Sequence, residues 1–431
     1  TATDYAAAIA ALAGSDTTGE RGSIYYDEAL TTAYVAHRLP AAYGCVLQAL
    51  NTTSKQLQQR HPRSHRYLPR TMLDYGCGTA AATAAAATTF PSLRRVVAIE
   101  PSAAMRAAAA VVVDAIAGVD GGSGDDKELN DDDADDDADD DIVPLKVTYN
   151  DYDAVGGTAQ FDLVVASFVM SEVAAARHQR RLLRRLWQHT APGGVLLVVD
   201  GGGAAISKVV GGLRDAILGV HSRSGSASSD ASREEDGGSD VEAEDEYDFL
   251  VQRSGGGGSS SSSRKGEGEN GGGESGAQMI APCPHSRRCP MLASTTIAAD
   301  DSGKVPTGWC HFSQRVMRAR YQLERKIGPN FNSATSRNWD DIKFSYFSVR
   351  RPLDGEAATT TAPTTADAAR STNIGRVLSR PLKRGGHVIA DVCDSDGAAR
   401  RVIVPRSAGR DVYRPLRKAR WGDAVRVPLL K

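Results

Sequence analysis

The sequence lacks any long hydrophobic run. Hydrophobic residues make up 41% of its 431 positions, yet no apolar segment approaches the roughly 20 residues that a membrane-spanning helix needs. We therefore expect a protein without a membrane span. The start of the chain shows no secretory signal, and its Ala-rich segment at residues 6–13 has no Arg of the kind found in transit peptides. Because the sequence begins at Thr1 rather than at Met, we expect a processed form that has lost a targeting segment.

Cysteine is also scarce. Six cysteines in a chain of this length are too few for a disulfide scaffold, and no two of them form a Cys-x-x-Cys pair. Reduced thiols in an intracellular compartment are the expected state. The chain is longer than a single hydrophobic core usually supports, so we expect at least two folded modules.

The net charge is low only on average. The formal charge is −2, but residues 120–141 carry −12 and residues 230–248 carry −9. The remaining 390 residues carry +19, so two acidic tracts mask a basic protein. Residues 281–431 hold 27 Lys and Arg against 13 Asp and Glu, enough to neutralise several phosphates of a nucleic acid. We expect a basic helical face at Arg315, Arg318, Arg320, Arg325 and Lys326, and a second basic patch at Arg414, Arg417, Lys418 and Arg420.

The first half of the chain follows an α/β pattern. In residues 25–60, apolar residues recur at the intervals of one helix face, which predicts a helix. From Thr71 onward, continuous apolar segments such as Val96–Ile99, Phe161–Ala166 and Val195–Val199 alternate with helical ones. Continuous apolar strands separated by helices are typical of a buried, largely parallel sheet. The sequence therefore predicts an α/β fold.

The C-terminal part of the chain shows further elements. A basic helix is predicted after Trp309–Phe312, and Phe344–Val349 has the composition of a strand. A β-hairpin is expected to pair His387–Cys393 with Arg401–Pro405 across the turn Asp396-Gly397.

A glycine-rich loop, Asp74-Tyr75-Gly76-Cys77-Gly78-Thr79-Ala80, directly follows a predicted strand and opens a helix. Glycines at such a place allow a tight turn and let a ligand approach the backbone. Glu100 ends the next strand, where a carboxylate can accept hydrogen bonds from both ribose hydroxyls of an adenosyl cofactor. Together with the surrounding strands, this pattern is typical of the class I S-adenosylmethionine-dependent methyltransferase fold. A nicotinamide-binding Rossmann domain is the competing interpretation, but Ala80 stands where its third glycine would be.

The residues expected to bind S-adenosylmethionine are Asp74, Gly76, Cys77, Gly78 and Glu100. No residue is predicted to be catalytic. The segment Ser167–Glu172, after the fourth strand, has neither an Asn/Asp-Pro-Pro-aromatic motif nor a Pro-Cys nucleophile. Glu172 is chemically able to act as a base, but a solvated position in the first turn of a helix explains it more simply.

Four cysteines from three segments of the chain are candidates for one metal centre. Four thiolates can close around one centre and tie the C-terminal hairpin to the main domain. A tetrahedral zinc site that uses His285 or His311 competes with a [4Fe–4S] cluster held by four cysteines. Ordinary buried thiols are the third interpretation and the preferred one for Cys45. The four candidates are Cys283, Cys289, Cys310 and Cys393.

Several strings resemble one protein family. Ala281-Pro282-Cys283-Pro284-His285 and Trp309-Cys310-His311-Phe312 are the most specific. With weaker strings around them, they resemble the mitochondrial small-ribosomal-subunit assembly family of methyltransferase-like proteins. The resemblance covers roughly residues 25–118, 142–220 and 279–426. The weaker strings are Cys289-Pro290, Ser313-Gln314-Arg315, Lys343–Tyr346, Arg350-Arg351, Tyr413-Arg414 and Trp421–Asp423.

The resemblance implies a protein of the mitochondrial matrix that binds small-subunit rRNA together with ribosomal proteins or assembly factors, and no DNA. It also implies a methyltransferase-like domain and a [4Fe–4S] cluster, with zinc as the alternative. The ligands that the family pattern implies are Cys283, Cys289, Cys310 and Cys393, with residues 293–307 as an insertion between the second and the third. An active S-adenosylmethionine-dependent rRNA methyltransferase is the alternative function.

We therefore expect six regions along the chain. They are an N-terminal helical region (1–70), a methyltransferase-like core (71–220) with an acidic insertion (120–141), a disordered low-complexity insertion (221–278), a cysteine-rich metal module with the last core strands (279–356), a linker (357–371) and a basic C-terminal β extension (372–431).

Overall fold

The computed structural model describes nine stretches of the chain. Both acidic tracts, the predicted linker, the insertion at residues 293–307 and most of the predicted low-complexity insertion lie outside the described residues. The described stretches are residues 26–60, 67–119, 145–150, 158–173, 175–220, 276–292, 309–327, 337–353 and 374–427.

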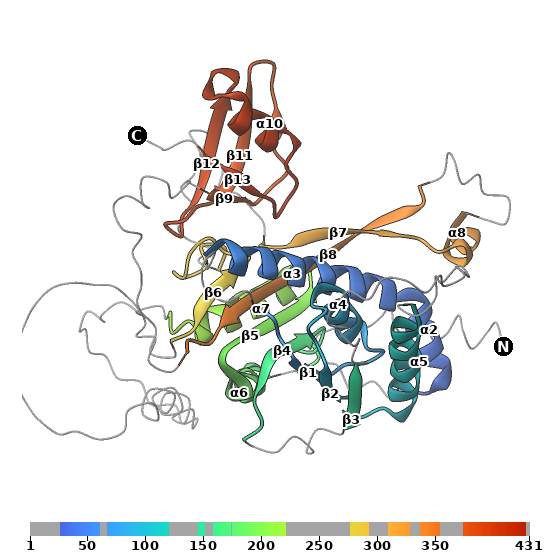
Figure 1. Cartoon of the computed structure of the whole chain (residues 1–431). Helices are drawn as coiled ribbons and strands as arrows, with labels where there is room; N and C mark the ends of the chain where they lie inside the picture. The colour runs from blue at the N-terminus through green and yellow to red at the C-terminus, as the bar shows by residue number, and fades with distance from the viewer. Residues whose placement is uncertain are drawn as a thin grey trace, which may run out of the picture.

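A mixed sheet forms the centre of the main domain (Figure 1). The strands β1 to β5 are parallel in the order β3-β2-β1-β4-β5, while β8 runs antiparallel to both β5 and β6. The order 3-2-1-4-5 is that of doubly wound folds, and here β8 adds an antiparallel strand beside β5. The predicted α/β fold is confirmed, as a mixed sheet. The strands are β1 (Thr71–Tyr75), β2 (Arg95–Ile99), β3 (Lys146–Asn150), β4 (Phe161–Ser167), β5 (Thr190–Gly201), β6 (Gln278–Ala281), β7 (Phe312–Met317) and β8 (Trp339–Arg350).

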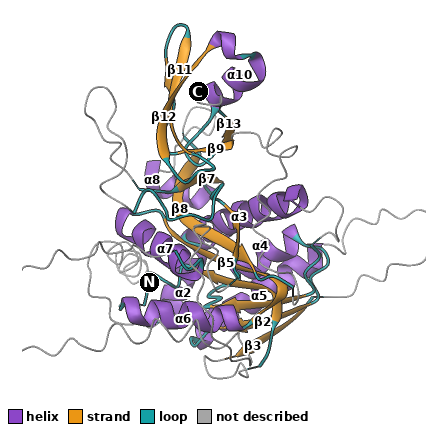
Figure 2. Ribbon diagram, turned by 90° about the vertical axis from the view of Figure 1, so that its left-hand side faces the viewer, coloured by secondary structure: helices purple, strands orange, loops and turns teal. Residues whose placement is uncertain are grey.

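Helices cover both faces of this sheet (Figure 2). Met72 and Leu197 point to the face covered by α3 and α4, and their neighbours Leu73 and Leu196 point to the face covered by α6 and α7. Because consecutive residues of a strand alternate between faces, a strand buried on both faces needs the continuous apolar pattern seen in the sequence. The helices are α2 (Glu28–His37), α3 (Leu39–Arg60), α4 (Ala81–Thr89), α5 (Ala103–Val119), α6 (Ala176–Gln188), α7 (Ala204–Ile217), α8 (Arg320–Ile327) and α10 (Arg410–Lys418).

The N-terminal helical segment is two helices rather than one. Asp27 caps α2, since its Oδ1 accepts a hydrogen bond of 2.8 Å from the backbone N–H of Leu30. The chain breaks at Arg38 and starts again as α3, which has Pro40 as its second residue. Proline has no N–H to continue the hydrogen bonds of α2, but it fits the first turn of a new helix. None of the described helices combines the length and the apolar character that crossing a bilayer requires.

A two-stranded ribbon extends from the sheet. The N-terminal half of β8 pairs with β7, from Phe312 opposite Phe344 to Met317 opposite Trp339. The prediction of a basic helix directly after Phe312 is therefore wrong for this stretch, and α8 begins only at Arg320. The cause is contact with distant parts of the chain, because β7 pairs with β8 and packs against α3 near Gly44.

A smaller β module follows at the C-terminus. Its hairpin of β11 and β12 confirms the predicted one and pairs Val392 with Arg400. The buried face of α10, including Tyr413 and Leu416, packs on the core of this module. The module contains β9 (Ile374–Val377), β10 (Leu382–Lys383), β11 (His387–Cys393), β12 (Ala399–Pro405), the 3-10 helix η2 (Arg406–Ala408) and β13 (Ala424–Arg426).

The module docks on the main domain, above which it stands in Figure 1. The ring centroids of Trp421 and His311 lie 3.7 Å apart. Gly422 has a φ of +87°, and a Cβ placed on it would lie 2.2 Å from Cδ1 of the buried Phe312 ring. The contact between backbone and ring therefore requires glycine.

We expect Gly422→Ala to lower the free energy of unfolding by about 1–3 kcal/mol, because the new methyl group overpacks against Phe312 and the φ angle disfavours a side chain. Urea denaturation checks the size of the effect, and amide exchange near Val377 checks loosening at the docking surface. The matched control is Gly385→Ala in the same module, where a Cβ meets no atom within 4 Å. Equal stability of the two variants would contradict the prediction.

Candidate functional site

The predicted cofactor loop lies at the carboxyl ends of β1 and β2. The backbone N–H groups of Gly76 and Cys77 both donate to the carbonyl of Ile99, at 2.9 Å each, which ties the loop to the neighbouring strand. Gly76 and Gly78 have φ angles of +71° and +52°. Both glycines thus use the left-handed conformation that side chains disfavour, as their place in the motif predicts.

Glu100 is brought to this loop. Its carboxylate is buried and accepts the backbone N–H of Gly78 at 3.1 Å and that of Ser102 at 2.9 Å. The contact with Ser102 also places Glu100 beside the N-terminal end of α5.

Asp74 lies fully buried beneath the loop. Its Oδ2 accepts hydrogen bonds from the backbone N–H and the hydroxyl of Thr83, at 3.1 and 2.8 Å. Its Oδ1 has no hydrogen-bond partner among the described residues. Burial, opposed by the two bonds from Thr83, raises the pKa of Asp74 to about 6. Burial also raises the pKa of the Cys77 thiol, which suits a small packed side chain.

The segment after β4 packs against the glycine loop. A Cβ on Gly76 would lie 2.3 Å from Cγ2 of Val169, so the side chain of Val169 fills that space. The segment is held by Asp200, whose carboxylate accepts the backbone N–H of Ser171 at 2.8 Å and its hydroxyl at 2.9 Å. Sequence reasoning missed Asp200, because nothing near it in the chain marks it. This arrangement identifies no catalytic residue.

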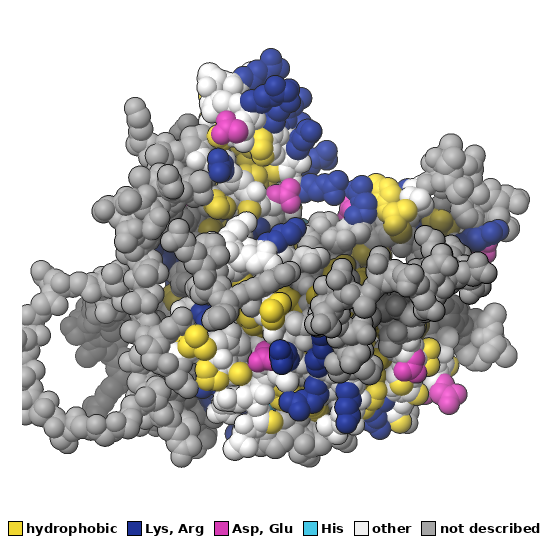
Figure 3. All heavy atoms as spheres, viewed as in Figure 1, with side chains coloured by type: hydrophobic (Ala, Val, Ile, Leu, Met, Phe, Trp, Pro, Cys, Tyr) yellow, Lys and Arg dark blue, Asp and Glu magenta, His cyan; other side chains and the backbone are white. Residues whose placement is uncertain are grey.

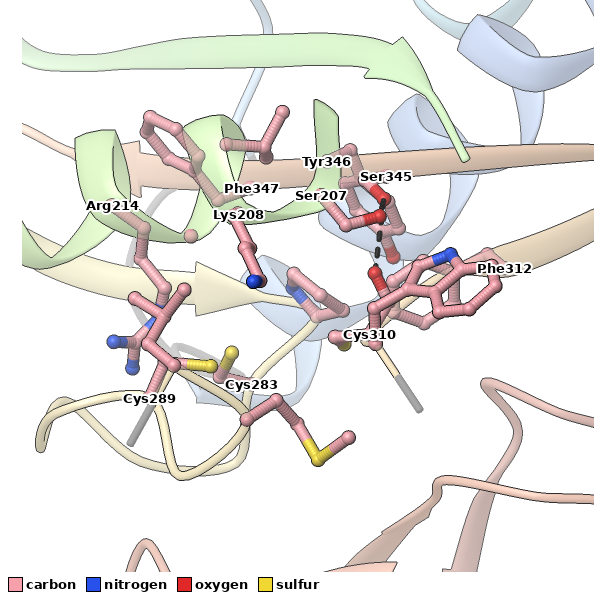
Figure 4. A pocket seen from close by; sticks show the side chains of 16 residues that line it. Ser207, Lys208, Arg214, Cys283, Cys289, Cys310, Phe312, Ser345, Tyr346 and Phe347 are labelled. Atoms are coloured by element: carbon pink, nitrogen blue, oxygen red, sulfur yellow. Dashed lines mark hydrogen bonds between the residues drawn. The ribbon is translucent and has the colours of Figure 1, made fainter. Parts of the chain in front are cut away.

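The four candidate cysteines line a second site. Cys283 and Cys289 lie in the loop after β6, Cys310 precedes β7, and Cys393 ends β11 in the module. All four line one cavity between the main domain and the module, and all four are free thiols. Figure 4 shows Cys283, Cys289 and Cys310 around the adjoining cavity, beneath α7.

The pKa values of these thiols reflect burial and mutual proximity. Burial, with a smaller contribution from the nearby Cys283, raises the pKa of Cys289 to about 12. The pKa values of Cys310 and Cys393 are also raised, first by burial and then by the other thiols. Within the described ranges, no three or more His, Cys, Asp or Glu side chains are arranged so that they could hold a metal ion. The structure therefore does not show the metal centre of the predicted cysteine-rich module.

The two candidate histidines have different surroundings. Nε2 of His285 lies 3.2 Å from Sγ of Cys393, at the cavity. Burial lowers the pKa of His285 to about 4, so its ring is neutral near pH 7. His311 instead stacks on Trp421, and its Nδ1 lies 3.1 Å from the carbonyl of Trp309. His311 is not among the residues that line either cavity.

The cysteine loop is held by a buried ion pair on α7. The carboxylate of Asp215 accepts the backbone N–H of Cys289, at 3.1 and 3.2 Å from its two oxygens, and pairs with Arg214. Arg214 in turn donates to the carbonyls of His285 and Arg287, at 2.8 and 2.9 Å. No motif pointed to this pair, since it lies more than seventy residues from the loop in the sequence.

We expect Asp74 to give the protein a pH-dependent stability. Its pKa is raised to about 6 in the folded state, so the free energy of unfolding should fall by on the order of 2–3 kcal/mol as the pH rises from about 4 to 6. Asp74→Asn removes the titrating group and should remove this decrease. Urea unfolding of both proteins between pH 4 and 7 checks it, with Asp114→Asn on the exposed side of α5 as the control. Parallel pH profiles for Asp74→Asn and wild type would contradict it.

Several known proteins are similar to this chain. The human mitochondrial ribosome assembly protein METTL17 is 24% identical over 404 residues, which cover 93% of this chain and 64% of that protein. Rsm22-cox11 tandem protein 2 of Schizosaccharomyces pombe is 35% identical over 163 residues. The Saccharomyces cerevisiae mitochondrial ribosome assembly protein RSM22 is 23% identical over 181 residues. Each of these two matches covers 34% of this chain, and they cover 19% and 28%, respectively, of the yeast proteins.

Solved structures of methyltransferases are similar over a smaller extent. The sugar N-methyltransferase KedS8 from Streptoalloteichus matches 42% of this chain and 56% of its own, at 20% identity and a TM-score of 0.25. A S-adenosylmethionine-dependent methyltransferase from Clostridium acetobutylicum matches 37% of this chain and 53% of its own, at 15% identity and a TM-score of 0.25.

The family profile described as mitochondrial small ribosomal subunit Rsm22 matches residues 28–227 and 273–426. The matched ranges contain the glycine loop, Glu100 and all four cysteines of the cavity. They also span both the main domain and the C-terminal module. The chain therefore belongs to the Rsm22 family of mitochondrial small ribosomal subunit proteins.

Proposed function

We propose that this protein is an assembly factor of the mitochondrial small ribosomal subunit, works in the mitochondrial matrix and binds the rRNA of that subunit. The relatives named as mitochondrial ribosome assembly proteins support the proposal. The observation that carries it is a basic and aromatic surface that continues from the β7–β8 ribbon onto α10 of the module. Small-subunit ribosomal proteins or other assembly factors are its expected protein partners.

The ribbon contributes an Arg-aromatic cluster. The guanidinium of Arg315 lies 3.4 Å from the ring centroid of Trp339, and that of Arg337 lies 4.0 Å from the same centroid. Nζ of Lys343 lies 5.8 Å from the ring centroid of Trp309. Clusters of arginine and aromatic rings suit RNA, because they offer both charge to phosphates and flat surfaces to bases.

The module contributes a basic helix face. Tyr413 and Leu416 of α10 are buried, so its other face is turned to solvent. Arg420, just after α10, is near enough to Asp341 of the ribbon to help lower the pKa of that carboxyl, after the larger effect of the hydrogen bond from Arg315. Lys and Arg side chains gather over the module and the ribbon in Figure 3. The exposed basic residues in and beside α10 are Arg406, Arg410, Arg414, Lys418 and Arg420.

We further propose that a [4Fe–4S] cluster joins the two domains at the cysteine cavity. Four cysteines are the donor set of such a cluster, and here they come from both domains and are free of disulfides. Each thiolate of a cluster binds a different iron atom, so the donors need not converge on one point as they must for zinc. When bound, the cluster would supply a covalent cross-link between the domains. Its ligands would be Cys283, Cys289, Cys310 and Cys393. Zinc is the alternative, and it would require the same thiols to converge on one point.

Methyl transfer from S-adenosylmethionine to rRNA is the second candidate function. Two left-handed glycines beside a carboxylate at the end of β2 favour it. Glu100 would accept the ribose hydroxyls, while Asp74, Gly76, Cys77 and Gly78 would form the floor of the site. No residue is assigned to the transfer itself. A cofactor that only stabilises the fold is compatible with the same loop.

We expect anaerobically purified protein to contain about four iron and four sulfide per chain. Cys393→Ser should lower the metal content and the thermal stability together, because this thiol is the one that the module contributes. Elemental analysis, sulfide determination and thermal unfolding make the check. Cys45→Ser is the control, since Cys45 is buried in the main core away from the cavity. Stoichiometric zinc without sulfide in the wild-type protein would reject the cluster.

We expect the double change Arg414→Glu with Lys418→Glu to weaken binding of a small-subunit rRNA transcript at least about tenfold near 0.1 M salt. The slope of log affinity against log salt should fall by about 1.5, since each lost phosphate contact removes about 0.7–0.9. Filter binding over a salt series measures both quantities. The control reverses two exposed charges at the far edge of the sheet, Arg95→Glu with Lys146→Glu. Equal losses of RNA affinity in the two double variants would reject the proposed RNA-binding surface. Transfer of labelled methyl groups from S-adenosylmethionine to the RNA would favour the methyltransferase as the function.

A further inference from the structure

Two buried arginines lie at the cysteine site: Arg376 lines the cavity that holds all four cysteines, and Arg214 lines the adjoining cavity with three of them. Arg214 is 3% exposed and comes from α7, whereas Arg376 is 9% exposed and comes from β9 of the module. The Nε atom of each is buried and has no hydrogen-bond partner among the described residues. A buried N–H without an acceptor costs about 1–3 kcal/mol, and more in a charged group, so each arginine has an unmet need for an acceptor.

Strand pairing places Arg376 beside a candidate ligand. It lies directly opposite Cys393 in the antiparallel pair of β9 and β11. Directly opposite residues of an antiparallel pair point to the same face of a sheet, so both side chains reach the cavity together. One end of the guanidinium is held, because its Nη1 donates to the carbonyl of Gly422 at 2.8 Å.

Arg376 differs from Arg214 in its ion pairing within the described residues. It makes no ion pair with a carboxylate in the described part of the chain, whereas Arg214 is paired with Asp215. A buried cation without an anion is strongly disfavoured. Arg376 acts instead on the thiols, and it lowers the pKa of Cys310 against the larger effect of burial.

Arg214 lines the adjoining cavity, together with Cys283, Cys289 and Cys310. Its two Nη atoms hold the carbonyls of the cysteine loop, which leaves the Nε–H for another acceptor. Burial would lower the pKa of Arg214, but Cys283, Asp215 and Cys289 together outweigh burial and raise it. The guanidinium and the thiols are therefore close enough to interact strongly. Figure 4 shows Arg214 and Lys208 beside Cys283 and Cys289.

We propose that Arg214 and Arg376 are positioning residues that donate N–H hydrogen bonds and positive charge to an anionic, thiolate-bound group in the cavity, and that Arg376 sets its reduction potential. This inference rests on the proposed iron–sulfur cluster. A cluster with four thiolate ligands is negatively charged and becomes more so on reduction, so a nearby cation and N–H donors to sulfur favour the reduced form. Because Arg376 and Cys393 belong to the module, docking of the module delivers a ligand and its counter-charge together.

The test compares Arg376→Gln and Arg376→Lys with wild type, all purified anaerobically as full chains. At a fixed potential near the wild-type midpoint, Arg376→Gln should lower the ratio of reduced to oxidised cluster by about tenfold, equal to about 59 mV for a one-electron couple. Arg376→Lys keeps the charge, so its ratio of reduced to oxidised cluster should lie between those of wild type and Arg376→Gln. Dye-mediated titration followed by electron paramagnetic resonance measures the ratio. The control is Arg384→Gln, an exposed arginine of the same module.

The outcomes separate the two proposals. Wild-type protein without iron and sulfide rejects the cluster, and the role of the arginines with it. An intact cluster whose potential is the same in wild type and in Arg376→Gln rejects only the role of Arg376. If Arg376→Gln loses the cluster, recovery of iron in Arg376→Lys supports a role of the charge. Loss in both variants with an undocked module, measured by amide exchange, shows a merely structural role and overturns the inference.

Discussion

The pairing of β8 with β5 is the interaction on which the rest of the structure depends. β8 extends the main sheet beyond β5. Its C-terminal half pairs with β6, and its N-terminal half pairs with β7 in the ribbon. Ala281 of β6 pairs with Ser348, and Phe312 of β7 pairs with Phe344. Four residues of strand separate these two points, on the order of 13 Å. One strand thus brings together the loop that contains two cysteines and the segment that contains the third.

The junction formed there links every part of the proposed function. The fourth cysteine enters only when the C-terminal module docks, through the contacts of Trp421 with His311 and of Gly422 with Phe312. The same docking places Arg420, just after α10, near Asp341 of the ribbon, so the proposed basic surface depends on the docked arrangement. An interaction that fixes the module therefore controls both the cysteine cavity and the surface proposed for RNA. The cofactor loop, at the ends of β1 and β2, is built separately from this junction.

Sequence patterns predicted the features that depend on neighbouring residues. The glycine loop and Glu100 follow from strands and turns whose chemistry is local, and the structure places them together. The ribbon strand at Arg315 was predicted as a helix, because its pairing partner lies more than twenty residues away. Asp200 and Arg214 could not be found from the sequence. Each acts on a loop that only the folded chain brings near.

The sequence by itself determined the α/β class, the cofactor motif, the masked basic charge and the set of cysteines worth testing. Those properties reside in composition and in short-range periodicity. Only the tertiary structure decided that four cysteines from two domains line one cavity, with Arg376 in its lining and Arg214 in the lining of the cavity beside it. The physical reason is that strand register and domain docking depend on packing between segments far apart in the chain, which leaves no pattern in either segment alone.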